Sequence, residues 1–210
     1  FPFIKEKATN IPIMFFGDKI ELKKSNNEKV KKFVFVGTLN KRIRNPEYLL
    51  QLFEGIEKNF NNPSFKITFI GNLSDCKDII TKYESVLKEK LEIIPQVPKE
   101  EVKIYLDMAD ILINIGNNSK YQLPSKLIEY ISTGKTILNI VSSEDDTSEK
   151  FLGKYKKALN LNKNNDFTKN VNLLMDIINR KEELDLSSDY VESLIRMHRP
   201  RELLKLYDLE

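Results

Sequence analysis

A short basic run directly follows the first apolar segment of the chain that is typical of a buried strand. The apolar segment covers residues 33–37, and the basic residues are Lys41, Arg42 and Arg44. The forked guanidinium group of arginine matches the geometry of phosphate oxygens, and lysine adds a compact positive charge. The run is therefore a candidate site for a diphosphate group. A solvated basic loop is the alternative.

A second candidate site lies in the polar stretch 116–126, which leads from another apolar segment into an expected helix. The first turn of a helix has unpaired N–H groups and the positive end of the helix dipole, so it suits a phosphate. Ser125 is expected to cap this helix. The carboxylate of Glu129 leans toward the same opening and can accept hydrogen bonds from ribose hydroxyls. A surface glutamate favoured by the helix dipole is the alternative.

Six strand-like apolar segments alternate with helix-like segments along the chain. The expected strands are residues 33–37, 65–71, 91–94, 111–115, 136–141 and 158–161. This order predicts an α/β fold: a Rossmann-like doubly wound parallel sheet of about six strands with helices on both faces. Two C-terminal helical stretches, about 166–180 and 187–207, are expected after it. Ligands of such sheets bind beyond the carboxyl ends of the strands, where both candidate sites fall.

Composition narrows the classes of function. The single cysteine, Cys76, excludes an intrachain disulfide and a cysteine-based zinc site, and it suits a reducing cytoplasm. The single histidine, His198, falls in the last helical stretch and is expected to pack there. No segment has the ~18 apolar residues of a membrane span. Residues 1–44 hold 11 Lys/Arg against four Asp/Glu, so they could face phosphates or an acidic membrane surface, with a solvated linker as the alternative.

Two other patterns do not fit the chemistry that they suggest, and one common fingerprint is missing. Residues 133–136 resemble the end of a P-loop, but Glu129 stands where the motif needs glycine, and the segment follows a helix instead of a strand. The G-x-G-x-x-G fingerprint of dinucleotide-binding folds is absent. Asp145 and Asp146 have no other evident ligands beside them, so no metal site is expected.

An ordered series of segments resembles the C-terminal domain of retaining GT-B glycosyltransferases, family 4-like, of the bacterial surface-polysaccharide type. The matching segments are residues 33–39, 69–71, 94–98, 105–110 and 124–135, and the last one, which opens with Pro124-Ser125-Lys126, is the most specific. The resemblance covers roughly residues 30–165. It implies three parts: a linker or edge segment from a missing N-terminal domain (1–30), a nucleotide-sugar-binding domain (31–185) and a helix that crosses back to the N-terminal domain (186–210).

The resemblance also implies roles for individual residues. Catalysis, meaning stabilisation of the diphosphate leaving group, would fall to Arg42, Arg44 and Lys126. The substrate-binding residues would be Gly37, Lys41, Gln96, Val97, Ser125, Leu127 and Glu129. Among them, the main chain near Gln96 would meet the base and Glu129 the ribose. Tyr121 stands where the family has the first glutamate of its paired motif, which contacts the donor sugar.

The function implied is that of a hexosyltransferase, retaining by family resemblance. It would move a sugar from a nucleotide-diphosphate sugar to a saccharide or lipid-linked acceptor in cell-surface polysaccharide biosynthesis. We expect no cofactor, metal or nucleic acid, a cytoplasmic location with peripheral contact to the membrane, and no transfer activity for this chain alone. A non-catalytic nucleotide-binding or partner module, which Tyr121 favours, and a sugar-nucleotide epimerase of GT-B fold are the alternatives. A flavodoxin-like receiver is disfavoured, because it needs acidic residues after its first strand.

Overall fold

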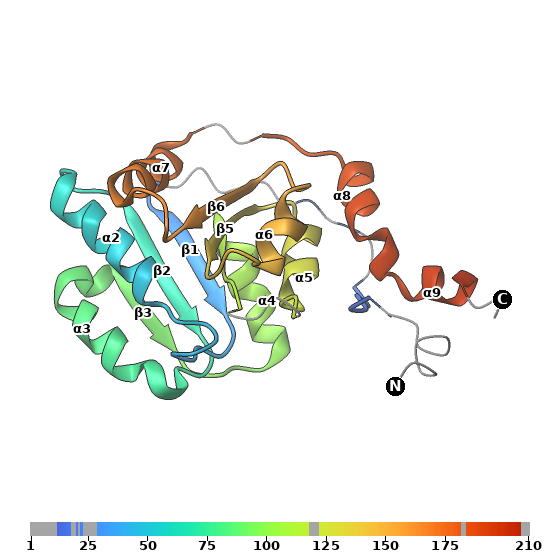
Figure 1. Ribbon diagram of the computed structural model, residues 1–210, viewed down its shortest axis with the longest axis horizontal. Helices are drawn as coiled ribbons and strands as arrows, with labels where there is room; N and C mark the ends of the chain where they lie inside the picture. Colours follow the sequence, from blue (N-terminus) through green and yellow to red (C-terminus); the bar gives the residue numbers. More distant parts are fainter. Residues whose placement is uncertain are drawn as a thin grey trace.

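The computed structural model describes residues 12–17, 20, 22, 29–117, 122–181 and 184–206. The described residues form one six-stranded sheet with helices around it (Figure 1). The strands are β1 (Lys31–Val36), β2 (Phe65–Ile70), β3 (Leu91–Ile94), β4 (Ile111–Ile115), β5 (Thr136–Val141) and β6 (Ala158–Asn162). The helices are α2 (Glu47–Asn59), α3 (Lys77–Leu87), α4 (Lys99–Met108), α5 (Lys126–Ser132), α6 (Thr147–Leu152), α7 (Phe167–Asn179), α8 (Ser188–Ile195) and α9 (Pro200–Leu206).

All six strands are parallel and lie in the order β3-β2-β1-β4-β5-β6. The predicted fold class is therefore confirmed. The chain builds one half of the sheet outward from β1 to β3, then returns to the middle and builds the other half from β4 to β6. The chain leaves β1 and β4 in opposite directions at this switch point, so the ligand-binding crevice of such folds is expected at the carboxyl ends of these two strands.

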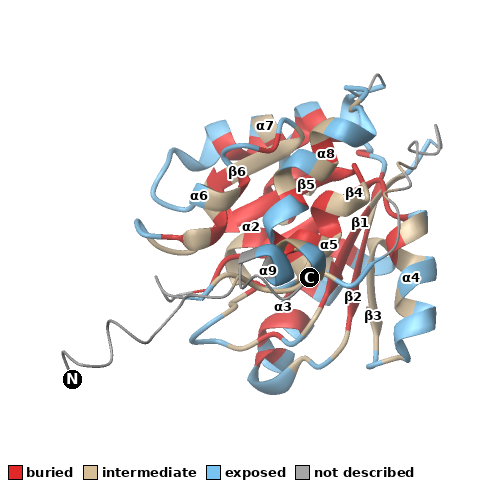
Figure 2. Cartoon of the chain, turned by 90° about the vertical axis from the view of Figure 1, so that its right-hand side faces the viewer, coloured by how far each residue is buried: buried red, intermediate tan, exposed pale blue. Residues whose placement is uncertain are grey.

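Each face of the sheet has its own hydrophobic core, because successive side chains of a strand point to opposite faces. Phe33 and Phe35 of β1 belong to the core under α2, α3 and α7, and Val34 and Val36 belong to the core under α4, α5, α6 and α8. Phe33 meets Phe53 of α2 edge to face, with 5.1 Å between ring centroids. Both faces are thus covered, and the central strands are buried (Figure 2). This is why the strands read as continuous apolar runs in the sequence.

The last helical stretch differs from the sequence expectation. The stretch expected as one helix over 187–207 is divided into α8, a 3-10 turn (Arg196–His198) and α9. Arg199 separates the last two with an extended backbone (φ −82°, ψ 133°), because Pro200 disfavours a helical conformation in the residue before it.

The described residues of the N-terminal segment, 12–17, form no strand and lie against the turn after α8. The Phe15 N–H donates to the His198 carbonyl (2.7 Å), and the His198 Nδ1 lies 2.8 Å from the Ile13 carbonyl oxygen. His198 is mostly buried, so the expectation that it packs in the last helical region is confirmed. The remaining expectations for the first part of the linker fall on residues 1–11, outside the described residues.

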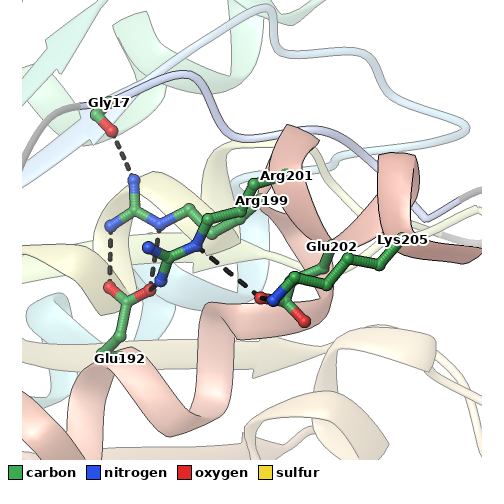
Figure 3. Close-up of polar contacts among 6 residues, drawn as sticks. All are labelled: Gly17, Glu192, Arg199, Arg201, Glu202 and Lys205. Atoms are coloured by element: carbon green, nitrogen blue, oxygen red, sulfur yellow. Dashed lines mark hydrogen bonds and ion pairs between the residues drawn. The ribbon is translucent and has the colours of Figure 1, made fainter. Parts of the chain in front are cut away.

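A cluster of ion pairs fastens this N-terminal segment to α8 and α9 (Figure 3). The Arg199 guanidinium group bonds both carboxylate oxygens of Glu192, at 3.2 and 2.8 Å, and also the Gly17 carbonyl. Its carbon lies 5.0 Å from the centroid of the Phe15 ring. The hydrogen bond from Arg199 holds the pKa of the Glu192 carboxyl below its usual value. We call these four residues the junction.

Candidate functional site

The carboxyl ends of β1, β2 and β3 are joined by main-chain hydrogen bonds. The Gly37 N–H donates to the Ile70 carbonyl (2.9 Å), and the Gly71 N–H donates to the Ile94 carbonyl (3.0 Å). Gly71 has a φ of +128°, and a Cβ atom added to it would lie 2.2 Å from the Gly37 carbonyl oxygen. Only glycine fits there. Gly37, a predicted substrate-binding residue, thus lies at the sheet edge in a fixed position.

The basic loop after β1 is a closed turn. Asn40 and Arg44 exchange two main-chain hydrogen bonds (3.1 and 2.8 Å), and the Asn40 side-chain oxygen accepts the N–H groups of Arg42 and Ile43 (3.0 and 3.1 Å). Asparagine is well suited to this role, because its side chain can close a turn over the next residues. The turn places Arg42 near its tip and Arg44 at its base. Arg42 and Arg44, which are equally good phosphate-ligand candidates in the sequence, therefore lie in different surroundings.

Arg44 bridges the two halves of the switch point. Its Nε donates to the Asn117 side-chain oxygen (2.7 Å), just after β4, and its Nη1 lies 3.5 Å from the Thr38 carbonyl. Asn117 is itself buried and donates to the Gln122 carbonyl (3.1 Å). Asn117 therefore fixes the direction of Arg44. Sequence reasoning placed Asn117 only within a polar loop, although an amide side chain beyond a buried strand is the available signal.

Lys41 and Arg42 do not join Arg44 in the crevice. The Lys41 ammonium donates to the Asp78 carboxylate of α3 (2.7 Å), and this bond raises the pKa of Lys41 and lowers that of Asp78. The Lys41 N–H donates to Asp75 in the turn before α3 (3.0 Å). Arg42 is exposed. Lys41 and Arg42 thus have surroundings different from those of Arg44.

Ser125 precedes α5 but does not cap it with its side chain, so that prediction is wrong. A capping side chain turns back to the second or third helical N–H from a residue with an extended backbone. Ser125 is already helical (φ −60°, ψ −30°), so its hydroxyl cannot make this bond. The N–H of Leu127 instead donates to the Pro124 carbonyl (3.1 Å). The Leu127 side chain is fully buried in the core, where it positions α5 rather than lining an opening.

Lys126 and Glu129 lie together on the first turn of α5. Their charged groups are 3.6 Å apart, and both side chains are more than one-third exposed. Such a pair contributes little to stability, so both groups remain available to a ligand. The roles predicted for Lys126 and Glu129 in binding the donor stay predictions.

Tyr130 connects this helix to the end of β1. Its buried hydroxyl accepts the Val36 N–H (3.3 Å). Burial raises the pKa of the phenol, Glu129 raises it further, and Arg44 lowers it. Tyr130 therefore ties α5 to the carboxyl end of β1. Sequence reasoning treated Tyr130 only as a core residue and missed this connection.

Gln96 and Val97 follow β3 on the same edge of the sheet. Gln96 is exposed, while Val97 is half-buried and packs against the core that contains α4 and α5. The main-chain contact with the base that the resemblance implies for Gln96 and Val97 stays a prediction. Tyr121 lies outside the described residues.

The loop after β5 is held by a buried carboxylate. Asp146 accepts the N–H groups of Ser142, Ser148 and Glu149 at 3.0, 2.8 and 3.3 Å, and so caps α6. A Cβ atom on Gly116 would lie 1.9 Å from the Asp146 carboxylate, so glycine is required there as well.

In the described part of the chain, no three His, Cys, Asp or Glu side chains gather as a metal site would need. No described helix has the length and apolar character to cross a bilayer.

Lys135 and Cys76, which both stand out in the sequence, are buried in the structure. The buried ammonium of Lys135, in the segment that resembles a P-loop, donates to the carbonyls of Asp107 (2.6 Å) and Ala109 at the end of α4. Cys76 is buried, and burial raises its thiol pKa to about 11. Neither residue belongs to the crevice.

Solved glycosyltransferase structures share this fold. The chain aligns over 98% of its length with TarM (TM-score 0.66, 13% identity) and with the lipopolysaccharide outer core galactosyltransferase WaaB (0.62, 15%). It spans only 40% of TarM and 57% of WaaB. One S. aureus TarM structure is a complex that includes UDP.

The chain also aligns with nearly the whole length of a smaller structure, the C-terminal domain of the group 1 glycosyltransferase LpcC from Francisella tularensis. The alignment covers 90% of this chain and 97% of that domain, with a TM-score of 0.55 and 11% identity. No curated protein matches the sequence significantly. The sequence profile of the glycosyl transferases group 1 family matches residues 18–176, which is most of the chain. The chain therefore belongs to the glycosyl transferases group 1 family.

Proposed function

We propose that this chain is the donor-binding domain of a glycosyltransferase that uses a nucleotide-diphosphate sugar. The observation that carries the proposal is that Arg44, after β1, bonds Asn117, after β4 (2.7 Å), while Lys126 and Glu129 lie together on the first turn of α5, the helix that follows β4. Arg44 supplies a fork for phosphate oxygens, and Glu129 accepts hydrogen bonds from hydroxyls. Family membership supports the same function.

In this proposal each group has a distinct task. Arg44, directed by Asn117, and Lys126 would bind the diphosphate and stabilise the negative charge that grows on it as the sugar leaves. Glu129 would hold the ribose, and the main chain at Gln96 and Val97 would meet the base. Arg42 and Lys41 have no place in this set, because the structure directs them elsewhere.

The remaining parts of the reaction are proposed from the relatives. Because the chain spans about half of TarM and WaaB, we propose that a further domain supplies the acceptor site and that this chain alone transfers no sugar. The acceptor would be a saccharide or lipid-linked saccharide of cell-surface polysaccharide synthesis, met at the membrane surface. The transferred group would be a hexose, and no metal or cofactor would take part.

A thermal-shift screen tests the donor site. The chain would be heated with UDP, GDP, ADP, CMP and their common sugar conjugates. A ligand at 100 times its dissociation constant adds about 2.7 kcal/mol of stability. A shift with one nucleoside diphosphate and its conjugates supports the proposal and names the base. The absence of any shift would contradict it and favour a partner-binding module.

Replacing Glu129 with alanine tests the ribose contact. We expect the affinity for the nucleotide found in the screen to fall by about 1–3 kcal/mol, because the ribose hydroxyls lose their acceptor. Glu101→Ala is the matched control, since Glu101 also lies in the first turn of a helix, on α4. Isothermal titration calorimetry measures both. Equal affinities for the two variants would remove Glu129 from the site.

A further inference from the structure

A depression of about 300 Å³ lies beside the crevice, on the same edge of the sheet. It is bounded by the tip of the β1 turn, the start of α2 and the ends of β5 and β6, and its lining includes Arg42, Tyr48, Ser142 and Lys163. The groups assigned to the donor, Arg44, Lys126 and Glu129, are not part of this lining. The depression is therefore a separate feature of the surface.

The lining carries a surplus of positive charge. Lys41 is neutralised by Asp78 (2.7 Å), and Glu47 is paired with Lys82 (3.3 Å). Arg42 makes no ion pair with any carboxylate among the described residues, and the same holds for Lys163. These two cations come from loops far apart in the sequence, after β1 and after β6. The fold thus brings two uncompensated charges to one hollow.

The rest of the lining suits a sugar that carries an anion. Ile140 and Val141, at the end of β5, supply apolar surface, and the hydroxyls of Tyr48 and Ser142 supply polar atoms. The Ser142 hydroxyl donates to the Gly116 carbonyl (2.6 Å), next to the residue that directs Arg44. The hollow and the crevice are therefore neighbours. A ligand in the hollow would lie close to a donor in the crevice.

We propose that this depression is a second anion-binding site, which takes the phosphate group of a phosphorylated saccharide between Arg42 and Lys163. A guanidinium and an ammonium group together provide the donors that a phosphate monoester accepts. The site's further role, to hold an acidic acceptor beside the donor, rests on the proposed function. Binding of the phosphate itself does not.

Calorimetry with glucose 6-phosphate as the probe, and glucose as its neutral counterpart, tests this site. The titrations use the whole chain in phosphate-free buffer of low ionic strength. We expect glucose 6-phosphate to bind and glucose not to bind. Arg42→Gln and Lys163→Gln should each raise the dissociation constant about threefold or more, and the double variant about tenfold or more. Lys103→Gln, which removes an exposed charge on α4, is the matched control and should have no effect.

Two further titrations separate this inference from the donor site. Arg44→Gln should leave the affinity for glucose 6-phosphate unchanged, and saturation with the nucleotide found in the screen should not displace the sugar phosphate. The inference is overturned if glucose 6-phosphate does not bind at about 10 mM, if Lys103→Gln weakens it as much as Arg42→Gln does, or if the nucleotide competes with it. A chain that binds the sugar phosphate through Arg42 but binds no nucleotide would refute the proposed donor function alone.

Discussion

The carboxyl edge of the sheet and the junction are held by different kinds of interaction. At the edge, main-chain bonds join Gly37 and Gly71 to the neighbouring strands, and a neutral amide fixes Arg44. At the junction, the charged groups of Arg199 and Glu192 bond each other, and Arg199 also donates to the Gly17 carbonyl. The first set consists of main-chain groups and a neutral amide that holds an arginine. The second is an ion pair, whose carboxylate can be protonated in acid and whose attraction salt can screen.

This difference indicates how each region responds to its surroundings. The edge should keep its shape when pH or salt changes, so that a ligand meets groups that are already in place. The junction should loosen when its charges are protonated or screened. Disrupting one region at a time, or perturbing both together, tests this difference.

The largest effect is expected for Gly71→Ala. The new methyl group would lie 2.2 Å from the Gly37 carbonyl oxygen, and alanine would have to adopt a φ of +128°. We expect the free energy of unfolding to fall by about 3 kcal/mol or more. Urea denaturation measures it, with Gly153→Ala as the control, since the nearest atom to a Cβ atom there is 3.4 Å away. Equal stability of the two variants would mean that the strand ends are not locked as described.

Asn117→Ala should separate stability from binding. Arg44 would lose the acceptor of its Nε, and we expect the affinity for the nucleoside diphosphate to fall by about 1–2 kcal/mol. Asn139→Ala is the control, because Asn139 is equally buried and bonds Asn114 and Asn160 across the sheet (2.7 and 2.8 Å). Both variants should lose stability in urea, but only the first should lose affinity in calorimetry. A loss of affinity in both would indicate a general loosening of the sheet.

Glu192→Gln should weaken the junction in a pH-dependent way. The pKa of Glu192 is held below its usual value of 4.5, so its stabilisation is complete above that value and is lost as the pH falls through the lowered pKa. We expect the variant to be less stable by about 1 kcal/mol at pH 7, and the difference to vanish in acid. Urea denaturation at several pH values measures this, with the exposed Glu84→Gln as control. A difference that persists at the lowest pH would exclude the ion pair as its cause.

Salt should have the smallest effect, and only at the junction. Raising NaCl from about 0.05 M to about 1 M shortens the screening length to about 3 Å and weakens the pair of Arg199 with Glu192. Amide exchange of Phe15, whose N–H bonds His198, should then quicken about twofold to threefold. Exchange at Gly71 should not change. If salt quickened exchange equally at both amides, the contrast between the two regions would not hold.

The sequence was sufficient to predict the strands and the sheet. Residues 33–36 are all apolar, although their side chains alternate between two cores, and such runs are typical of buried parallel strands. The helix break at Arg199 could also have been predicted from the sequence, because a proline follows it. The expected single helix over 187–207 overlooked that signal.

The directions of the three basic side chains could not be predicted. Lys41 is turned by Asp78, a residue 37 positions away, and Arg42 is separated from Arg44 by the bonds that Asn40 makes within the turn. Ser125 shows the same limit, since its residue type fits a cap but its backbone is already helical. Spacing along the chain indicates which groups are near the crevice. Only the fold decides which of them point into it.

The most direct test of the donor site is a titration of the ¹⁵N-labelled chain with the nucleoside diphosphate found in the screen, followed by amide chemical shifts. We predict that shifts concentrate at Gly37, Arg44, Asn117 and Lys126, around the crevice, while amides of the junction such as Phe15 do not move. Shifts centred on α8 and α9, or none at the crevice at a saturating nucleotide concentration, would contradict the account.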